Sequence, residues 1–348
     1  MTFCADLGAF LACAEGKRRD WIMEYRQLNR TDLRVSRLCL GTMTFGKPID
    51  QPTANRMVER SLEAGINFFD TANAYQHGGA EVMLGTALAS RRKQVVLASK
   101  VQHKMGDGPD DFGLSKRAIL RAIDQSLRRL HTDYLDIYYL HAPDYKVPIE
   151  ETLETMNTLV SQGKVRYIAT SNYASWQVCE MYWIAEKNRY QVPSISQPMY
   201  SLVARGIEQE YLPMCKRLGI SNIVYNPLAG GLLSGKHDPK TLTPGGRFDP
   251  AFWGYPLYKH RYWHEQTFKA VEQLKKVAAE AGRSLPSLAF NWLLHHTAAD
   301  GIILGASRME QLEENLKTCE EGPLSPETVK ACDAVWEEFR GPVPIYNR

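Results

Sequence analysis

The sequence lacks long apolar runs and paired cysteines. None of its apolar runs approaches ~20 residues, the length that a membrane-spanning helix requires. Its cysteines stand singly, without C-x-x-C spacing, at positions 4, 13, 39, 179, 215, 319 and 332. A membrane partner, a disulfide framework and a metal site are therefore not expected. Isolated thiols in odd number favour a reducing compartment, and we expect a cytoplasmic protein.

The sequence also lacks a strong excess of either charge. Lys and Arg number 42 against 39 Asp and Glu, which gives a formal net charge of +3. It has no clustered basic stripe with interleaved aromatic residues, so nucleic acid is not an expected partner. The remaining composition, 44% hydrophobic and 23% charged, is typical of a globular protein. The length admits either two domains or one large α/β barrel.

The first 22 residues differ from the rest of the chain. A short apolar patch at residues 7–14 comes before the basic residues 17–19, whereas a secretory signal carries its basic residues first. We therefore expect residues 1–22 to be a disordered extension or a mis-assigned start. Residues 23–348 are expected to form a single domain that begins naturally at Met23.

The rest of the chain alternates between short apolar runs and segments with helical spacing. Segments 25–28 and 33–36 flank a turn, which predicts a hairpin. After it we expect eight buried strands, at 37–41, 66–69, 95–99, 135–140, 165–170, 194–197, 221–225 and 301–304. Helices are expected at about 53–64, 80–90, 115–130, 150–161, 174–187, 208–218, 287–296 and 309–319.

This alternation predicts an α/β fold, the (β/α)8 TIM barrel. Strands that are apolar on both faces and joined by helices imply parallel pairing with right-handed crossovers. A doubly wound sheet usually carries G-x-G-x-x-G after its first strand, but residues 41–46 read G-T-M-T-F-G. A loop over 237–262 and a tail from 341 complete the prediction, and long loops on a barrel tend to cover a ligand.

Polar residues stand where the predicted strands end, which is where barrel active sites lie. Each alone has an ordinary explanation, such as a turn cap, a solvated lysine or a hydrogen-bonded core histidine. Together they would converge on one mouth of the barrel. These residues are Asp70, Lys100, His141, Ser171, Asn172, Gln197, Tyr225 and Asn226, with Tyr75 in the loop five residues beyond Asp70.

Such a set suits proton delivery to the oxygen of a carbonyl group whose carbon receives a hydride. A tyrosine with a pKa near ~10 is a poor acid at neutral pH. A nearby ammonium group stabilises the tyrosinate and lowers that pKa. A buried aspartate keeps the lysine charged, and a histidine can orient the carbonyl through a hydrogen bond.

Several of these segments match a known family. They are Gly41-Thr42-Met43, Phe69-Asp70-Thr71-Ala72, Tyr75, Ser99-Lys100, Leu140-His141, Ser171-Asn172-Tyr173, Gln197 and the whole run 225–236. With them the sequence resembles the aldo-keto reductase superfamily from about residue 23 to its end. Within it the chain is most similar to the aflatoxin aldehyde reductase branch. That narrower match rests on Y-L-H-A-P-D at 139–144, S-N-Y-A-S-W at 171–176, R-Y-W at 261–263, E-E-G-P-L at 320–324 and Y-N-R at 346–348.

The resemblance implies reduction of aldehydes or dicarbonyls to alcohols by hydride transfer from NADPH, which leaves NADP+. Tyr75 would be the general acid, Lys100 would lower its pKa, Asp70 would hold Lys100, and His141 would position the carbonyl. Ser171, Asn172 and Gln197 would hold the nicotinamide carboxamide, and Tyr225 would stack on the ring. Further cofactor contacts would come from Asn226, Pro227, Leu228, Gly230, Gly231, Leu232, Ser234, Gly235 and Lys236.

Residues 230–236 also imitate a phosphate loop, with the pattern G-x-x-x-x-G-K. That motif needs Ser or Thr next, but His237 follows, and then Asp-Pro in place of a helix. ATP binding is therefore not expected, although the backbone amides can still cradle a pyrophosphate.

The adenosine end of the cofactor would lie at the last strand and helix. A helix N-terminus with an arginine suits a 2′-phosphate. An ordinary capped helix with a surface arginine is the alternative. The resemblance favours phosphate binding by Gly305, Ser307, Arg308, Gln311, Glu314 and Asn315, with Arg247 as a second cation.

On the substrate side, Tyr258, Arg261 and Arg348 match positions that grip an acidic group in that branch. An aldehyde with an acidic group, such as succinic semialdehyde, is the implied substrate, because arginine pairs with carboxylates in a fork. A surface arginine at a helix start is the alternative for Arg261.

Two functions stay open for the whole chain. The first is an NADPH-dependent reductase, a monomer or homodimer, that acts on a small-molecule carbonyl substrate. The second is an NADPH-binding regulatory subunit, like the β subunits of ion channels, with little turnover. The segment 261–263 and the terminal arginine favour the reductase.

Overall fold

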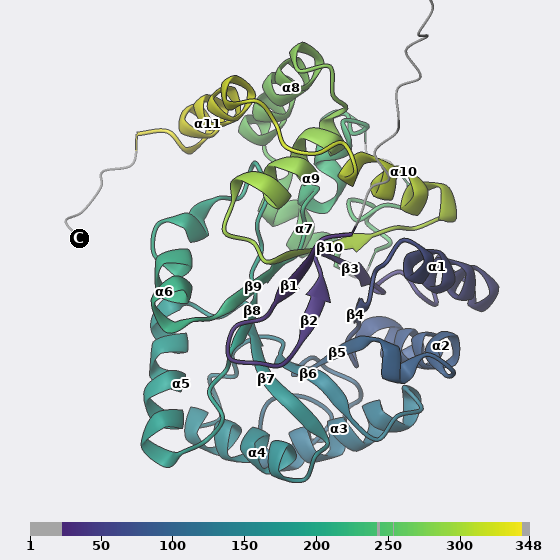
Figure 1. Cartoon of the computed structure of the whole chain (residues 1–348), viewed down its shortest axis with the longest axis vertical. Coiled ribbons are helices and arrows are strands. Elements are labelled where there is room, and N and C mark those ends of the chain that lie inside the picture. The colour runs from purple at the N-terminus through teal and green to yellow at the C-terminus, as the bar shows by residue number, and fades with distance from the viewer. Residues whose placement is uncertain (1–22, 242–243, 253, 343–348) are drawn as a thin grey trace, which may run out of the picture.

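The computed structural model describes residues 23–241, 244–252 and 254–342. The predictions for residues 1–22 and for the tail from 343 lie outside the described residues. Eight parallel strands close into a barrel in the order β10-β3-β4-β5-β6-β7-β8-β9, which confirms the predicted TIM barrel (Figure 1). They are β3 (Leu38–Gly41), β4 (Phe68–Asp70), β5 (Val96–Val101), β6 (Leu135–Leu140), β7 (Val165–Ser171), β8 (Ile195–Gln197), β9 (Ser221–Val224) and β10 (Gly301–Gly305).

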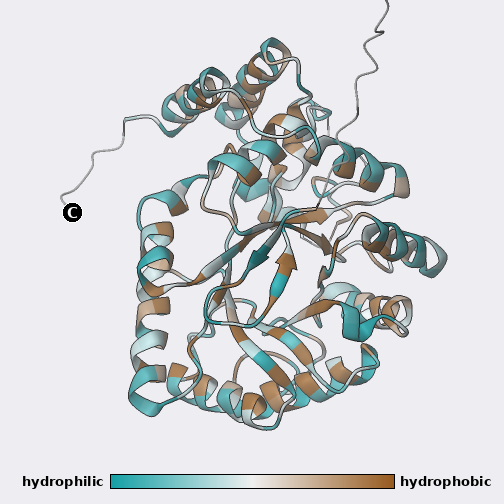
Figure 2. Cartoon of the chain, viewed as in Figure 1, coloured by the Kyte–Doolittle hydropathy of each residue, from teal (hydrophilic) through white to brown (hydrophobic). Residues whose placement is uncertain are grey.

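Helices surround the barrel, with hydrophilic residues on their outer sides (Figures 1 and 2). Figure 2 shows hydrophobic residues on the strands and on the helix sides that face them. The helices of the first six units are α1 (Gln51–Glu63), α2 (Gly79–Leu88), α3 (Lys116–Arg129), α4 (Ile149–Ser161), α5 (Ser175–Asn188) and α6 (Tyr211–Leu218). After β9 come α7 (Tyr255–Tyr262), α8 (Glu265–Glu280) and α9 (Leu285–His296), and after β10 come α10 (Met309–Cys319) and α11 (Pro326–Arg340).

Side-chain caps explain where several helices begin. Asp50 accepts a hydrogen bond from the Thr53 amide at the start of α1, and Ser115 accepts one from the Ala118 amide at the start of α3. The apolar stripe of α3 then faces the barrel, with Ile119 and Ile123 fully buried.

The predicted hairpin is confirmed, and it closes the amino-terminal end of the barrel. Its antiparallel strands are β1 (Tyr25–Gln27) and β2 (Arg34–Ser36). Leu28 and Val35 are fully buried in one cluster with interior residues of the barrel such as Phe68. The Asn29 amide donates to Ser221 Oγ at 2.9 Å, where β9 begins. Within the described residues, the hairpin therefore leaves the opposite, carboxyl end of the barrel open for a cavity.

The helical content after β9 differs from the prediction. Helix α7 lies inside the predicted loop 237–262, and helices α8 and α11 were not predicted. Helices α8 and α11 pack on each other beside the barrel. They are additional to the one helix that the regular alternation places after each strand. Before β9, the predicted helix 208–218 also differs: it is a 3-10 turn, Gly206–Glu208, followed by α6.

Two classes of feature are missing from the described ranges 23–241, 244–252 and 254–342. No helix there is both long and apolar enough to cross a bilayer. No cluster of three or more His, Cys, Asp or Glu side chains in those ranges is arranged to hold a metal ion.

Candidate active site

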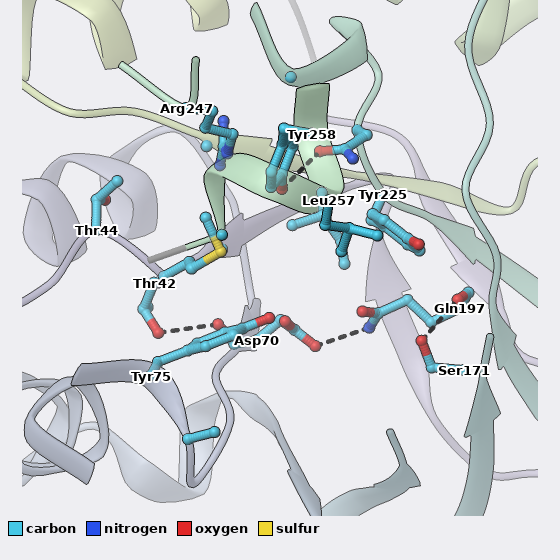
Figure 3. A pocket seen from close by; sticks show the side chains of 18 of the residues that line it. Thr42, Thr44, Asp70, Tyr75, Ser171, Gln197, Tyr225, Arg247, Leu257 and Tyr258 are labelled. Carbon is cyan, nitrogen blue, oxygen red and sulfur yellow. Dashed lines mark hydrogen bonds between the residues drawn. The ribbon is translucent and has the colours of Figure 1, made fainter. Parts of the chain in front are cut away.

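A cavity of about 590 Å³ opens at the carboxyl ends of the strands. Its walls come from the loops after nearly every strand, and Figure 3 shows Asp70 between Tyr75 and Gln197, with Arg247 and Tyr258 on the facing wall. The predicted residues that line it are Asp70, Tyr75, His141, Ser171, Asn172, Gln197, Tyr225, Asn226, Pro227, Leu228, Gly230, Gly231, Arg247, Tyr258, Arg261, Gly305 and Gln311.

Lys100 lies beneath the cavity floor and joins Asp70 to Tyr75. Its side chain has no exposed area, and Nζ donates to Asp70 Oδ1 and, at 2.7 Å, to the Thr71 carbonyl. Nζ also lies 3.5 Å from Tyr75 Oη. The three groups come from β4, from β5 and from η1 (Tyr75–Gly78), the turn before α2. A buried ion pair thus sits directly behind the phenol.

The backbone of η1 is unusual next to Tyr75. Gln76 and His77 have φ values of 50° and 51°, in the left-handed region that residues other than glycine rarely adopt. Two such residues in succession cost conformational energy, and strain of this kind concentrates at functional sites. The turn holds Tyr75 over the strand ends.

Burial dominates the pKa of Tyr75 in the protein without ligands. That pKa is raised to about 12 overall: loss of solvent raises it most, the charge of Lys100 lowers it, and the charge of Asp70 raises it. The Lys100 contribution has the sign that the sequence predicts, but the net shift is upward, because the sequence alone gives no measure of burial. Burial would lower the pKa of Lys100, yet Asp70 and Tyr75 together raise it above its ordinary value. Lys100 therefore stays charged and Tyr75 protonated at neutral pH.

His141 lies next to Tyr75 as a neutral imidazole. Burial lowers the pKa of His141 well below its ordinary value, and His103 and Lys100 lower it further. Its ring is edge-on to that of Tyr75, with ring centroids 6.0 Å apart and an interplanar angle of 78°. A neutral imidazole can donate one hydrogen bond to a carbonyl oxygen placed between the two rings.

A chain of hydrogen bonds crosses the cavity floor from Asp70. Gln197 Nε2 donates to Asp70 Oδ2 at 2.8 Å, and Ser171 Oγ donates to the Gln197 carbonyl at 3.0 Å (Figure 3). Asn172 Nδ2 donates to Ser171 Oγ at 3.0 Å, and Tyr225 Oη donates to Asn172 Oδ1 at 2.6 Å. The predicted amide-binding residues are therefore held in one network that includes the Asp70 carboxylate.

The loop after β9 fits a phosphate-bearing ligand. Gly230 has a φ of 70°, and a Cβ there would lie 2.7 Å from Tyr258 Cδ1. Glycine is therefore needed for the backbone to pass this close to the Tyr258 ring. Arg247 stacks on Tyr258 with its guanidinium 5.4 Å from the ring centroid. Its Nε is buried and has no hydrogen-bond partner in the part of the chain that the structure describes. An anion in the cavity would satisfy it.

The remaining predicted cofactor residues lie outside the cavity wall. Asn315 is buried, and its Nδ2 donates to the Gly305 carbonyl at 3.2 Å. Gln311 Oε1 accepts from the Ser307 amide at 2.9 Å. Arg308 is exposed, and its Nε lies 3.9 Å from Glu310 Oε2. The predicted residues that do not line the cavity are Leu232, Ser234, Gly235, Lys236, Ser307, Arg308, Glu314 and Asn315, while Lys100 lies beneath it.

The predicted substrate residues divide in two. Tyr258 and Arg261 come from α7 and line the cavity, whereas Arg348 lies outside the described residues. Tyr258 Oη lies 3.5 Å from Asn226 Oδ1. Burial raises the pKa of Tyr225, and the neighbouring Arg261 lowers it, so a cation lies beside the ring that the sequence predicts to stack on the nicotinamide.

Several cavity residues were not predicted as site residues. They are Gly41, Thr42, Met43, Thr44, Ala74, Gln76, His77, His103, Lys104, Gly254, Leu257, Phe290 and Ile303. Thr42 and Met43 follow a strand end, so the same reasoning that found Asp70 applies to them. His103 comes three residues after Lys100, but a lone histidine in a loop has no periodic pattern to mark it.

Comparison with known proteins agrees with this geometry. A model described as the aldo/keto reductase family matches residues 37–337. The chain is 37% identical over 324 residues to aflatoxin B1 aldehyde reductase member 2 of Rattus norvegicus, covering 89% of this chain and 87% of that protein. It is 36% identical over 319 residues to a probable voltage-gated potassium channel subunit beta of Oryza sativa subsp. japonica, covering 90% and 96%. It is 38% identical over 309 residues to the uncharacterized oxidoreductase YrpG of Bacillus subtilis, covering 86% and 91%.

Proposed function

Because the chain belongs to the aldo/keto reductase family, we propose that it reduces aldehydes to alcohols with NADPH, and that Tyr75 is the general acid. The chain is an oxidoreductase, and a nicotinamide cofactor is typical of the family. The observation that carries the proposal is the buried ion pair of Lys100 and Asp70 directly behind Tyr75, at the floor of the cavity.

Each residue of the floor has one task in this mechanism. The carbonyl oxygen of the substrate lies between Tyr75 and His141 and accepts a hydrogen bond from each. Tyr75 transfers its proton as negative charge develops on that oxygen, and the ammonium group of Lys100 stabilises the tyrosinate that results. Asp70 holds Lys100 in place and offsets the cost of burying its charge. NADPH, when bound, supplies the hydride.

The residues present fit the cofactor along the wall of the cavity. Ser171, Asn172 and Gln197 offer donors and acceptors for a carboxamide, and Tyr225 offers a ring face. The glycines at 230 and 231 and the unpartnered Nε of Arg247 suit a pyrophosphate. We propose that Arg308, at the start of α10, binds the 2′-phosphate that distinguishes NADPH from NADH.

Replacing Arg308 with alanine should weaken NADPH binding by about 10-fold or more, with little effect on NADH, because only NADPH offers an anion at that position. Titration of protein fluorescence with each cofactor measures both dissociation constants. Lys317→Ala, an exposed cation at the far end of α10, is the control and should change neither constant. Equal weakening of NADPH and NADH binding would remove Arg308 from the 2′-phosphate site.

For the substrate, we propose an aldehyde that carries an acidic group, gripped by Arg261. Arg261→Ala should raise the KM for succinic semialdehyde by about 10-fold, since an arginine–carboxylate fork is lost, and should leave the KM for 4-nitrobenzaldehyde within about 2-fold. Arg261→Lys keeps the charge without the fork, so its KM for succinic semialdehyde should lie between those of the parent protein and of Arg261→Ala. Steady-state rates of NADPH oxidation give these constants. If both aldehydes lose affinity equally, Arg261 supports the cavity wall and does not recognise the acid.

The resemblance to a potassium channel subunit in rice motivates a second candidate, a regulatory subunit that binds NADPH with little turnover. The two functions differ in one measurement. A reductase oxidises NADPH steadily when a panel of aldehydes is supplied. A regulatory subunit binds NADPH but shows no sustained turnover with any member of the panel.

A further inference from the structure

His103 is a cavity residue for which the mechanism above has no task. It lies in the loop after β5, three residues beyond Lys100, and it lines the cavity. Its ring lies against that of His141, with centroids 4.3 Å apart and an interplanar angle of 50°. His103 itself is exposed, whereas His141 next to it is only 8% exposed. His103 therefore stands between His141 and solvent.

We propose that His103 is a positioning residue whose ring covers one face of His141, excludes water from it and fixes its angle toward Tyr75. The proposal rests on the proposed role of His141 as a donor to the substrate carbonyl. The ring of His141 contacts two others, that of Tyr75 at a centroid distance of 6.0 Å and that of His103 at 4.3 Å. Its Nδ1 is buried and makes no hydrogen bond within the described ranges, so ring contacts and not a polar partner set its orientation.

The electrostatic surroundings agree with this role. The titratable groups that face His141 are Tyr75 from η1, Lys100 from β5 and His103 from the following loop, with Asp70 behind Lys100. Burial is the largest cause of the lowered pKa of His141, and it exceeds the effects of His103 and Lys100. Partial burial and Lys100 also lower the pKa of His103. Both rings are therefore neutral near neutral pH, and the main effect of His103 is to keep water away.

The proposal is tested by following the imidazole of His141 by NMR in the full-length protein, with His141→Gln used to assign its signal. In the parent protein the signal should not move between about pH 8 and about pH 5.5, since His141 stays neutral. In His103→Ala, water reaches the ring, and the signal should titrate within that range. In His103→Phe the aromatic cover remains, and the signal should again stay fixed.

Kinetics provide the second readout. His103→Ala should lower kcat/KM for aldehyde reduction by about 10-fold and add an inflection to its pH profile at the NMR midpoint of His141. His103→Phe should restore both the rate and the flat profile. Asp107→Asn, in the same loop with a side chain 95% exposed, should change neither readout.

Two outcomes overturn the proposal. If His141 stays neutral throughout the titration of His103→Ala, His103 is not its cover. If His103→Phe titrates like His103→Ala, the ring is not what protects His141. If the His141 signal titrates in His103→Ala as expected but the kinetics do not change, His103 covers His141, yet His141 has no role in reduction. The two proposals therefore fail separately.

Discussion

Replacing Tyr75 with phenylalanine should lower kcat for aldehyde reduction by about 10²- to 10⁴-fold, the range that loss of a general acid commonly costs. The change removes one oxygen atom and leaves the ring that contacts His141 and lies 5.0 Å from Lys100 Nζ. Among the hydrogen bonds of the described residues, Lys100 is bonded to no phenol other than Tyr75. Initial rates of NADPH oxidation at saturating cofactor measure the loss.

The matched control is Tyr145→Phe, which removes the same atom from a side chain that is 84% exposed. It should keep the parental rate. NADPH binding to Tyr75→Phe should stay within about 2-fold, because the phenol acts on the carbonyl and not on the cofactor. A Tyr75→Phe enzyme that retained half of the parental kcat would show that another acid delivers the proton.

Replacing Lys100 with methionine should damage both stability and activity. It leaves the Asp70 carboxylate buried at 2% exposure, with Gln197 as a partner but without a cation. Breaking a buried ion pair in this way costs about 3–5 kcal/mol in the free energy of unfolding. Reduction should be almost lost, because nothing then stabilises the tyrosinate. Urea unfolding and NADPH oxidation measure the two effects.

The double variant Asp70→Asn with Lys100→Met separates the effect on stability from the effect on activity. With no charge left unpaired, most of the stability should return, while the activity should not. Lys164→Met is the control, because its pair with Asp124 is exposed and should contribute less than about 1 kcal/mol. Full activity in the double variant would exclude the ion pair from the reaction.

The stability contribution of Lys100 also has a predicted dependence on pH. Its pKa is raised in the folded protein, so the folded state holds this proton more tightly than the unfolded chain does. The contribution is complete below the ordinary lysine pKa of about 10.4 and is lost as the pH rises through the folded value. It is therefore fully present at neutral pH, where the assays are made.

The positions of Asp70, Lys100 and Gln197 were predictable because each follows a short apolar run. In a parallel barrel, a run that is buried on both faces fixes the direction of its strand and thus the end at which the next polar residue lies. The register agrees, since Gly41 pairs with Asp70 and Ser171 with Gln197. The strand ends could therefore be predicted without knowledge of side-chain packing.

Other parts of the site depend on contacts that no local pattern records. The net pKa shift of Tyr75 follows from how deeply the folded chain buries the phenol, and this outweighs Lys100. His103 meets His141 only because two loops converge, although the residues are far apart in the sequence. Helix α8 has readable spacing in Val271, Leu274 and Ala278, but it packs on α11 outside the regular alternation.

The hairpin of β1 and β2 has a kinetic consequence. Because it fills the amino end of the barrel, ligands that share the cavity reach it through the same mouth. A molecule that lies against the floor must arrive before the one that covers it and must depart after it. Two-ligand turnover should therefore be sequential and ordered, and a dead-end competitor for the outer position should trap the inner ligand in place.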